Sequence, residues 1–185
     1  MTWYNETITE MGLLSQMAYQ SFGSDLVKGQ SYHKFTDDGV VYYLDKTYTV
    51  IDHTDTSTDM QALLLKSGDE YVVAFRGTAG VVDIAVDAVI GLGNINAQYT
   101  EALAFVKKAL GKTYDGVTVT EDNLTLAGHS LGGILTQQVG AALELDGYAF
   151  SAFGFQGNFA SQPLFASFDA AINNNLNLKN ESEVA

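Results

Sequence analysis

A single serine stands in the pattern Gly-X-Ser-X-Gly, at Gly128-His129-Ser130-Leu131-Gly132. A short apolar strand is predicted before this pattern, over residues 123–127, and a helix is predicted after it. A sharp turn between a strand and a helix projects a serine hydroxyl above the sheet, where it can attack an acyl carbon. The N–H of Leu131 would then face the developing oxyanion. A glycine-rich turn with a capping serine is the structural alternative for Ser130.

A second segment could complete this chemistry, because an acyl-transfer site needs two donors on one oxygen. The predicted strand over residues 71–75 ends in Arg76-Gly77-Thr78. Thr78 can offer its N–H and its hydroxyl, and Gly77 permits a turn. Arg76 is the only arginine of the chain, and we favour a structural role in which it pairs with a carboxylate and holds this loop.

Together the two segments, Phe75-Arg-Gly-Thr78 and Leu126-Ala-Gly-His-Ser-Leu-Gly-Gly133, resemble those of the class 3 lipases, which are α/β-hydrolases. The resemblance implies hydrolysis of carboxylic esters, often of acylglycerols or phospholipids. It implies Ser130 as nucleophile, and Thr78 and Leu131 as oxyanion donors. It also implies that the segment 79–97 holds or borders a lid, although its apolar residues fit an ordinary packed helix equally well.

The usual partners of a serine nucleophile are missing from this sequence. The expected chain order is serine, then an acid, then histidine, yet no histidine follows Ser130. His129 is expected to be packed or hydrogen-bonded near the turn, and His33 and His53 lie upstream. The acids after Ser130 fall at helix ends, within a helix or in the tail, and are Glu144, Asp146, Asp169, Glu181 and Glu183.

Without the triad Asp and His, we expect a truncated and largely inactive hydrolase. Its sheet would be incomplete at the C-terminal edge, and self-association or a completing chain would cover that edge. Two alternatives remain open: a non-catalytic module that binds a lipid or a protein, and a serine peptidase or thioesterase on the same fold. The Phe-Arg-Gly-Thr match favours the lipase over the peptidase.

The elements that must position these residues follow from hydrophobic periodicity. A capping box at Thr7–Glu10 predicts a helix over 8–21, and a further helix over 97–110 is predicted with Asn96 as its cap. Predicted strands cover 40–44, 48–51, 60–65, 71–75, 123–127 and 148–155, with a polar loop over 52–59 and helices over 134–145 and 163–173.

This alternation in the second half predicts an α/β fold with a mostly parallel central sheet flanked by helices, similar to the α/β-hydrolases. We expect one partial domain over residues 1–185, with a C-terminal tail over 174–185.

Composition limits the partners. The chain has 185 residues, 46% of them hydrophobic, and a net charge of −13, which argues against nucleic acid and anionic membranes. A lipid or small ester substrate stays compatible with this charge. The chain has no cysteine, and the polar loop 52–59 matches no metal-binding spacing, so no cofactor and no metal are predicted. No signal peptide or transmembrane segment is recognisable, which fits a cytoplasmic protein or leaderless export.

Overall fold

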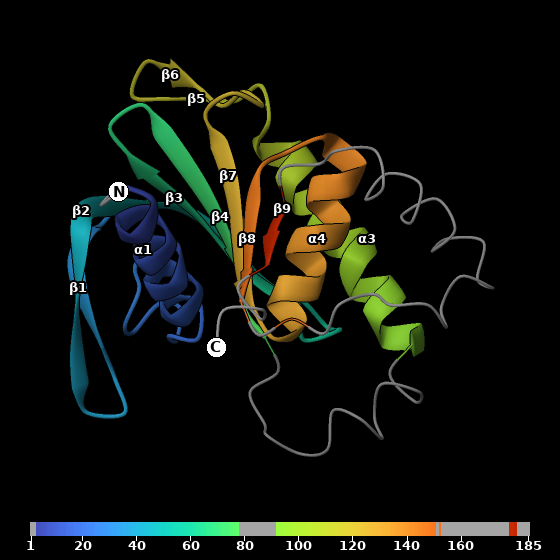
Figure 1. Ribbon diagram of the computed structural model, residues 1–185, viewed down its shortest axis with the longest axis horizontal. Coiled ribbons are helices and arrows are strands. Elements are labelled where there is room, and N and C mark those ends of the chain that lie inside the picture. The colour runs from blue at the N-terminus through green and yellow to red at the C-terminus, as the bar shows by residue number, and fades with distance from the viewer. Residues whose placement is uncertain (1–2, 78–91, 151, 153–177, 181–185) are drawn as a thin grey trace.

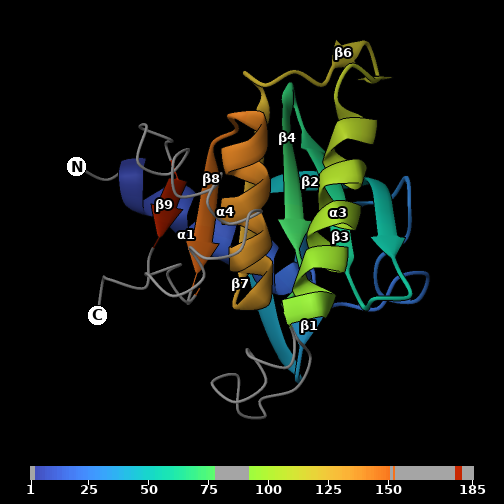
Figure 2. The ribbon, with the colours of Figure 1, turned by 90° about the vertical axis from the view of Figure 1, so that its right-hand side faces the viewer.

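The computed structural model describes residues 3–77, 92–150, 152 and 178–180. They form three layers, in which a seven-stranded sheet lies between helix α1 on one face and helices α3 and α4 on the other (Figures 1 and 2). The helices are α1 (Trp3–Met17), α3 (Leu92–Ala109) and α4 (Leu131–Leu143). The predicted α/β class is therefore confirmed, whereas the prediction of a mostly parallel sheet was wrong, because three of the described strand pairings in this sheet are antiparallel and three are parallel.

The sheet has the strand order β1-β2-β3-β4-β7-β8-β9. Its strands are β1 (Ser31–Asp37), β2 (Val40–Asp55), β3 (Gln61–Ser67), β4 (Glu70–Phe75), β7 (Leu124–His129), β8 (Gly147–Phe150) and β9 (Leu178–Asn180). The first four pair antiparallel, whereas β4, β7, β8 and β9 pair parallel, and the arrows of β4 and β8 point the same way in Figure 2. A separate small hairpin joins β5 (Thr113–Tyr114) to β6 (Val117–Thr118). Because parallel strands end at one edge, β4 and β7 bring Phe75 and Gly128 level with each other.

Both faces of the central strands are buried, which is why β3 and β4 have continuous apolar sequences. Along β4, Tyr71, Val73 and Phe75 pack under α3 and α4, while Val72 and Ala74 pack under α1. The helices that flank the sheet are thus held by side chains of alternating orientation from the same strand.

Helix α1 begins at Trp3, earlier than predicted, so the predicted capping box was wrong. Glu10 lies within the helix and is buried, with 3% of its surface exposed. Its carboxylate accepts hydrogen bonds from the N–H groups of Asp45 and Lys46 at 3.0 and 3.1 Å. The carboxylate therefore accepts hydrogen bonds from strand β2 and does not cap the N-terminus of its own helix.

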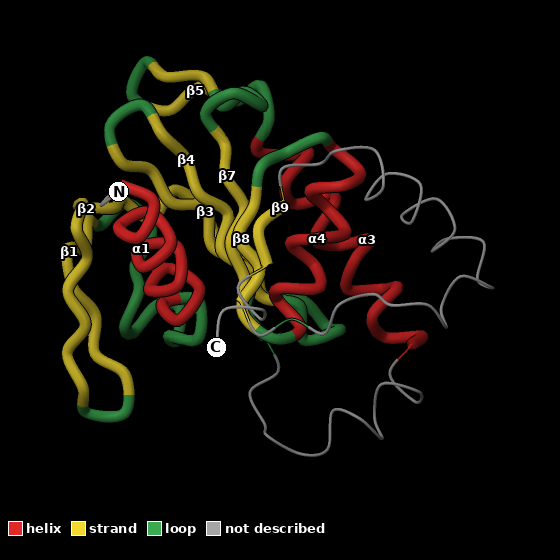
Figure 3. The backbone as a smooth tube through the Cα atoms, in the orientation of Figure 1, coloured by secondary structure: helices red, strands yellow, loops and turns green. Residues whose placement is uncertain are grey.

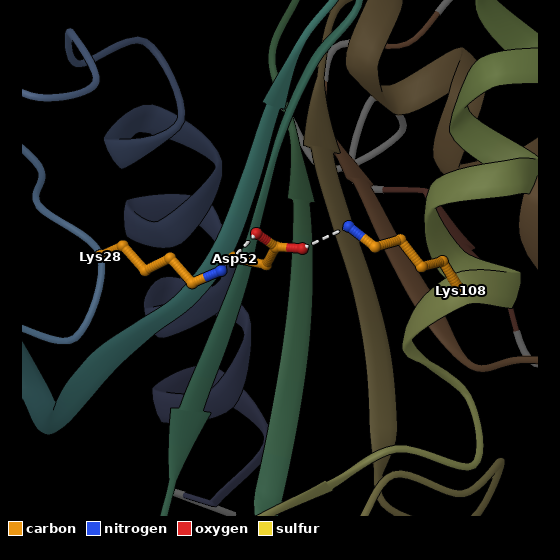
Figure 4. Close-up of polar contacts among 3 residues, drawn as sticks. All are labelled: Lys28, Asp52 and Lys108. Carbon is orange, nitrogen blue, oxygen red and sulfur yellow. Dashed lines mark hydrogen bonds and ion pairs between the residues drawn. The ribbon is translucent and has the colours of Figure 1, made fainter.

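Strand β2 extends to Asp55, through part of the segment predicted as a polar loop. The extension places Asp52 between two lysines, where its carboxylate pairs with Lys28 at 3.0 Å and with Lys108 at 2.9 Å (Figure 4). Lys28 lies in the segment after α1, and Lys108 lies on α3. The two ion pairs connect the segments on opposite sides of the sheet.

Two more boundaries differ from the prediction. Helix α3 begins at Leu92, so Asn96 lies within it and is not its cap. Helix α4 begins at Leu131, directly after strand β7, as the tube in Figure 3 shows. Within the predicted tail 174–185, Leu178–Asn180 form β9 beside β8. Thr78, most of the predicted lid segment, the predicted helix over 163–173 and the rest of the tail lie outside the described residues.

Candidate functional site

Ser130 forms the turn between β7 and α4 and is partly exposed. Its backbone has φ 56° and ψ −122°, a conformation that is strained for a residue with a Cβ atom. Its N–H donates to the carbonyl oxygen of Phe150 at 2.9 Å, and its carbonyl accepts from the N–H of Gly133 at 2.9 Å. The surrounding backbone therefore fixes the strained turn.

The Ser130 side chain does not cap helix α4 through any described N–H group. The structural alternative for Ser130, a capping serine, has no hydrogen bond to support it. The hydroxyl stands instead at the carboxyl edge of the parallel strands, at the N-terminal end of a helix of 13 residues. Helix N-termini favour negative charge, so this position suits a developing anion.

Close backbone approach explains two of the glycines around Ser130. A Cβ atom on Gly128 would lie 2.2 Å from the carbonyl oxygen of Gly132, and one on Gly132 would lie 2.2 Å from the carbonyl oxygen of Phe75. Both distances are far below van der Waals contact, so only glycine fits at these positions. The turn can therefore lie directly against the end of β4.

The end of β4 continues into Gly77, which lies against the turn. A Cβ atom on buried Gly77 would lie 2.5 Å from the carbonyl oxygen of His129 and 3.2 Å from the Ser130 Cβ atom. The structure thus brings the Arg-Gly segment and Ser130 together, as the sequence led us to expect. Thr78 follows Gly77 directly, outside the described residues.

Arg76 holds this segment in place, and its hydrogen bonds within the described part of the chain go to Gln61. Its Nη1 donates to the side-chain oxygen of Gln61, and its backbone N–H donates to the Gln61 carbonyl oxygen at 3.0 Å. Gln61 is the first residue of β3. The prediction of a structural role fits these contacts, and among the described residues the partner is Gln61.

His129 is hydrogen-bonded beside the turn, as predicted. Its Nδ1 lies 3.0 Å from the hydroxyl oxygen of Tyr19. Burial lowers the pKa of His129, which keeps the imidazole neutral at physiological pH. Tyr19 follows helix α1, and the helical pattern of the sequence gave no sign that it would reach this site.

The other histidines lie far along the sheet from Ser130. His33 is on β1, and His53 is on β2 with its ring centroid 4.6 Å from that of Phe22. Strands β3 and β4 separate them from β7. Neither histidine therefore joins the candidate site.

Two of the acids that follow Ser130 are described, and both lie away from it. Glu144 is the C-cap at the opposite end of α4, and the Asp146 carbonyl oxygen accepts the N–H of Leu126 near the start of β7. Asp169, Glu181 and Glu183 lie outside the described residues. Across the described part of the chain, no three His, Cys, Asp or Glu side chains gather closely enough to hold a metal ion.

The described sheet and its flanking helices make this an α/β protein, with Ser130 in the turn between a parallel strand and a helix. A phospholipase-like family model, that of the Tle-like phospholipase domain, matches residues 10–178. The chain belongs to this lipase-like family, which acts on lipid esters. Searches of the curated proteins and of the solved structures find no significant match. Among the described helices, none is both long and apolar enough to cross a membrane.

Proposed function

We propose that this chain carries the nucleophile and the oxyanion site of a serine hydrolase that cleaves carboxylic esters of phospholipids. In this proposal Ser130 is the nucleophile, and the N–H groups of Leu131 and Thr78 stabilise the oxyanion. The fold is that of an α/β-hydrolase, similar to the class 3 lipases. Family membership favours a phospholipid over a peptide or a thioester.

The strained backbone of Ser130 is the observation that carries this proposal. A residue with a Cβ atom at φ 56° and ψ −122° costs about 1–3 kcal/mol, and such strain persists mainly where function needs it. The sharp turn that produces the strain is the one that presents a serine hydroxyl at the top of an α/β-hydrolase sheet. A packing role for Ser130 would need no such conformation.

The surroundings of Ser130 support the chemistry. Helix α4 begins at Leu131, so the Leu131 N–H is one of the amides that no carbonyl within the helix can satisfy. Gly77 lies against the turn from the side of β4, which supports a second donor in the residue that follows it. Two amides that converge from a helix N-terminus and a neighbouring strand end form the kind of oxyanion site that acyl transfer requires.

The reaction that follows is acyl transfer to water. The Ser130 oxygen attacks the ester carbonyl carbon and loses its proton to a base, and the carbonyl oxygen becomes the anion that the amides stabilise. Collapse of this intermediate releases the alcohol, and water then hydrolyses the acyl-enzyme. The sequence holds no histidine after Ser130, so we propose that a base outside this sequence is needed for full activity.

A fluorophosphonate probe tests the assignment of Ser130. We expect slow labelling of the chain at Ser130, lost in Ser130→Ala and retained in Ser31→Ala, which removes an exposed hydroxyl on β1. Mass spectrometry locates the adduct, and circular dichroism confirms that each variant is folded. Labelling that persists in Ser130→Ala, or a folded chain whose Ser130 never reacts, would contradict the proposal and favour a non-catalytic binding module.

A further inference from the structure

The hydroxyl of Tyr19 occupies the contact between the two segments of the proposed oxyanion site. A Cβ atom on Gly77 would lie 2.3 Å from the Tyr19 oxygen, so the hydroxyl rests directly on the Gly77 backbone. The same oxygen lies 3.0 Å from Nδ1 of His129, the residue before Ser130. One hydroxyl thus contacts the segment after β4 and the end of β7.

The Tyr19 oxygen lies against the Gly77 backbone, whose N–H can only donate and lowers the pKa of the hydroxyl, as a hydrogen bond to its oxygen does. Between Tyr19 and His129 we infer that the O–H donates to Nδ1, which corresponds to the neutral imidazole with its proton on Nε2. Burial raises the pKa of the Tyr19 hydroxyl, and the Gly77 hydrogen bond and the Arg76 charge lower it by less, so the hydroxyl keeps its proton.

We propose that Tyr19 is a positioning residue, which holds the Gly77 backbone and the Ser130 turn in register through its close contact with Gly77 and its hydrogen bond to His129. The inference rests on the proposed function, because it concerns the geometry of the proposed oxyanion donors. Thr78 follows Gly77 and Ser130 follows His129, so Tyr19 contacts the direct neighbours of a proposed oxyanion donor and of the proposed nucleophile. Tyr19 itself touches no reacting atom in this proposal.

Register matters here because oxyanion stabilisation depends on donor placement. Removing one donor entirely lowers turnover by about 10²–10³-fold in a well-studied serine protease. Displacing a donor without removing it costs less, so we expect the loss of the Tyr19 hydroxyl to slow the reaction by about 10-fold. Substrate binding relies on other contacts and should be unaffected.

The test measures fluorophosphonate labelling of Ser130 over a range of probe concentrations, which separates the maximal rate from the half-saturating concentration. We expect Tyr19→Phe to lower the maximal rate about 10-fold and leave the half-saturating concentration unchanged. Tyr32→Phe is the matched control, because the Tyr32 hydroxyl also accepts a backbone N–H, that of Val27 at 2.8 Å. Tyr32 lies on β1, which three strands separate from β7. This control should label at the wild-type rate.

Two substitutions of His129 distinguish positioning from general structural support. His129→Asn keeps an acceptor atom near the place of Nδ1 and should label almost as fast as the wild type. His129→Ala removes the acceptor and should be as slow as Tyr19→Phe, and the double variant should be no slower than either single one.

The outcomes separate this inference from the function on which it depends. If the wild type is labelled at Ser130 but Tyr19→Phe reacts at the wild-type rate, the role of Tyr19 is refuted and the function of Ser130 stands. Equal slowing of His129→Asn and His129→Ala would also refute it, because the acceptor atom would then be irrelevant. If the wild type is not labelled at Ser130, the proposed function itself fails.

Discussion

At the scale of single residues, the candidate site depends on glycines that allow backbone segments to touch. Gly132 is the clearest case, since the Phe75 carbonyl oxygen would lie 2.2 Å from its Cβ atom. The atom in the way belongs to the backbone of a buried central strand, so it cannot rotate aside as a flexible side chain would.

We therefore expect Gly132→Ala to lower the free energy of unfolding by about 3 kcal/mol, because strand β4 and helix α4 must move apart. Urea-induced unfolding followed by circular dichroism measures this change. Gly12→Ala is the matched control. Its Cβ atom would lie an ordinary 3.6 Å from the Phe150 ring, and alanine within α1 should add about 0.5–1 kcal/mol. Similar effects of the two substitutions would contradict the close approach.

The sequence predicted the serine turn but not Tyr19, and the difference has a physical cause. The turn is local: a strand, a Gly-X-Ser-X-Gly pattern and a helix follow one another along the chain. The contact between Tyr19 and His129 joins residues that are 110 positions apart, and no local pattern encodes such a pairing. Arg76 illustrates the same limit, since its structural role could be inferred but its partner, Gln61, could not.

At the scale of elements, the docking of α1 depends on Glu10. The buried carboxylate accepts two backbone N–H groups of the β2 segment at Asp45 and Lys46. Burial raises the pKa of the Tyr48 hydroxyl, and the charge of Glu10 and the hydrogen bond to it raise that pKa further. One carboxylate thus accepts two backbone N–H groups and raises the pKa of a neighbouring hydroxyl where α1 meets the sheet.

We expect Glu10→Gln to lower the free energy of unfolding by about 2 kcal/mol. The glutamine side chain has only one oxygen, so its NH₂ group would lie against a backbone N–H group and leave that donor without an acceptor. Glu6→Gln, on the exposed face of the same helix, carries the same change of charge and should shift stability by less than about 0.5 kcal/mol. Urea unfolding at pH 7 compares the two variants. Equal stability of both variants would show that Glu10 does not anchor α1.

The element boundaries that the sequence missed reflect such tertiary contacts. Thr7 to Glu10 has the pattern of a capping box, yet Glu10 satisfies donors on another element. The acidic segment from Asp52 has the composition of a solvated loop, yet pairing with β3 makes its first residues part of a long strand. By contrast, the strands over 60–65 and 71–75 were predicted correctly, because their apolar runs are local in sequence and are joined by a short turn at Gly68.

At the scale of the whole molecule, Asp52 links the segment after α1 to helix α3 around the side of the sheet (Figure 4). Burial raises the pKa of the Asp52 carboxyl, but hydrogen bonds and attraction from Lys108 and Lys28 outweigh this and lower the pKa overall. A lowered pKa in the folded state means that the ion pairs stabilise the protein above the pKa of the unfolded chain. This stabilisation is lost as the pH falls through the folded-state pKa.

We therefore expect Asp52→Asn to lower the free energy of unfolding at pH 7 by about 1 kcal/mol, since both lysines are largely exposed. The difference from the wild type should shrink as the pH falls below about 4. Urea unfolding at a series of pH values measures it, with Asp122→Asn, an exposed acid, as the control for net charge. A difference that does not change with pH would mean that the ion pairs contribute nothing.

The two halves of the sheet differ in how well the sequence predicted their arrangement. Its parallel part, β4, β7, β8 and β9, follows the predicted arrangement of strands and helices around the serine turn. The antiparallel part, β1 to β3, places His33 and His53 away from that turn. The sequence could not reveal this separation, because it arises from the order of strands across the sheet.

The packing of α1 on β7 also constrains the order in which the protein can assemble during synthesis. Helix α1 leaves the ribosome before β7, a strand on which it packs and which is translated more than a hundred residues later. The α1 side chains that pack on β7 stay without this partner through the interval, and exposed apolar surface of this kind is a reason why nascent chains need chaperones. The contact between Tyr19 and His129 is therefore tied to a late step of folding, when an early segment of the chain docks onto a much later one.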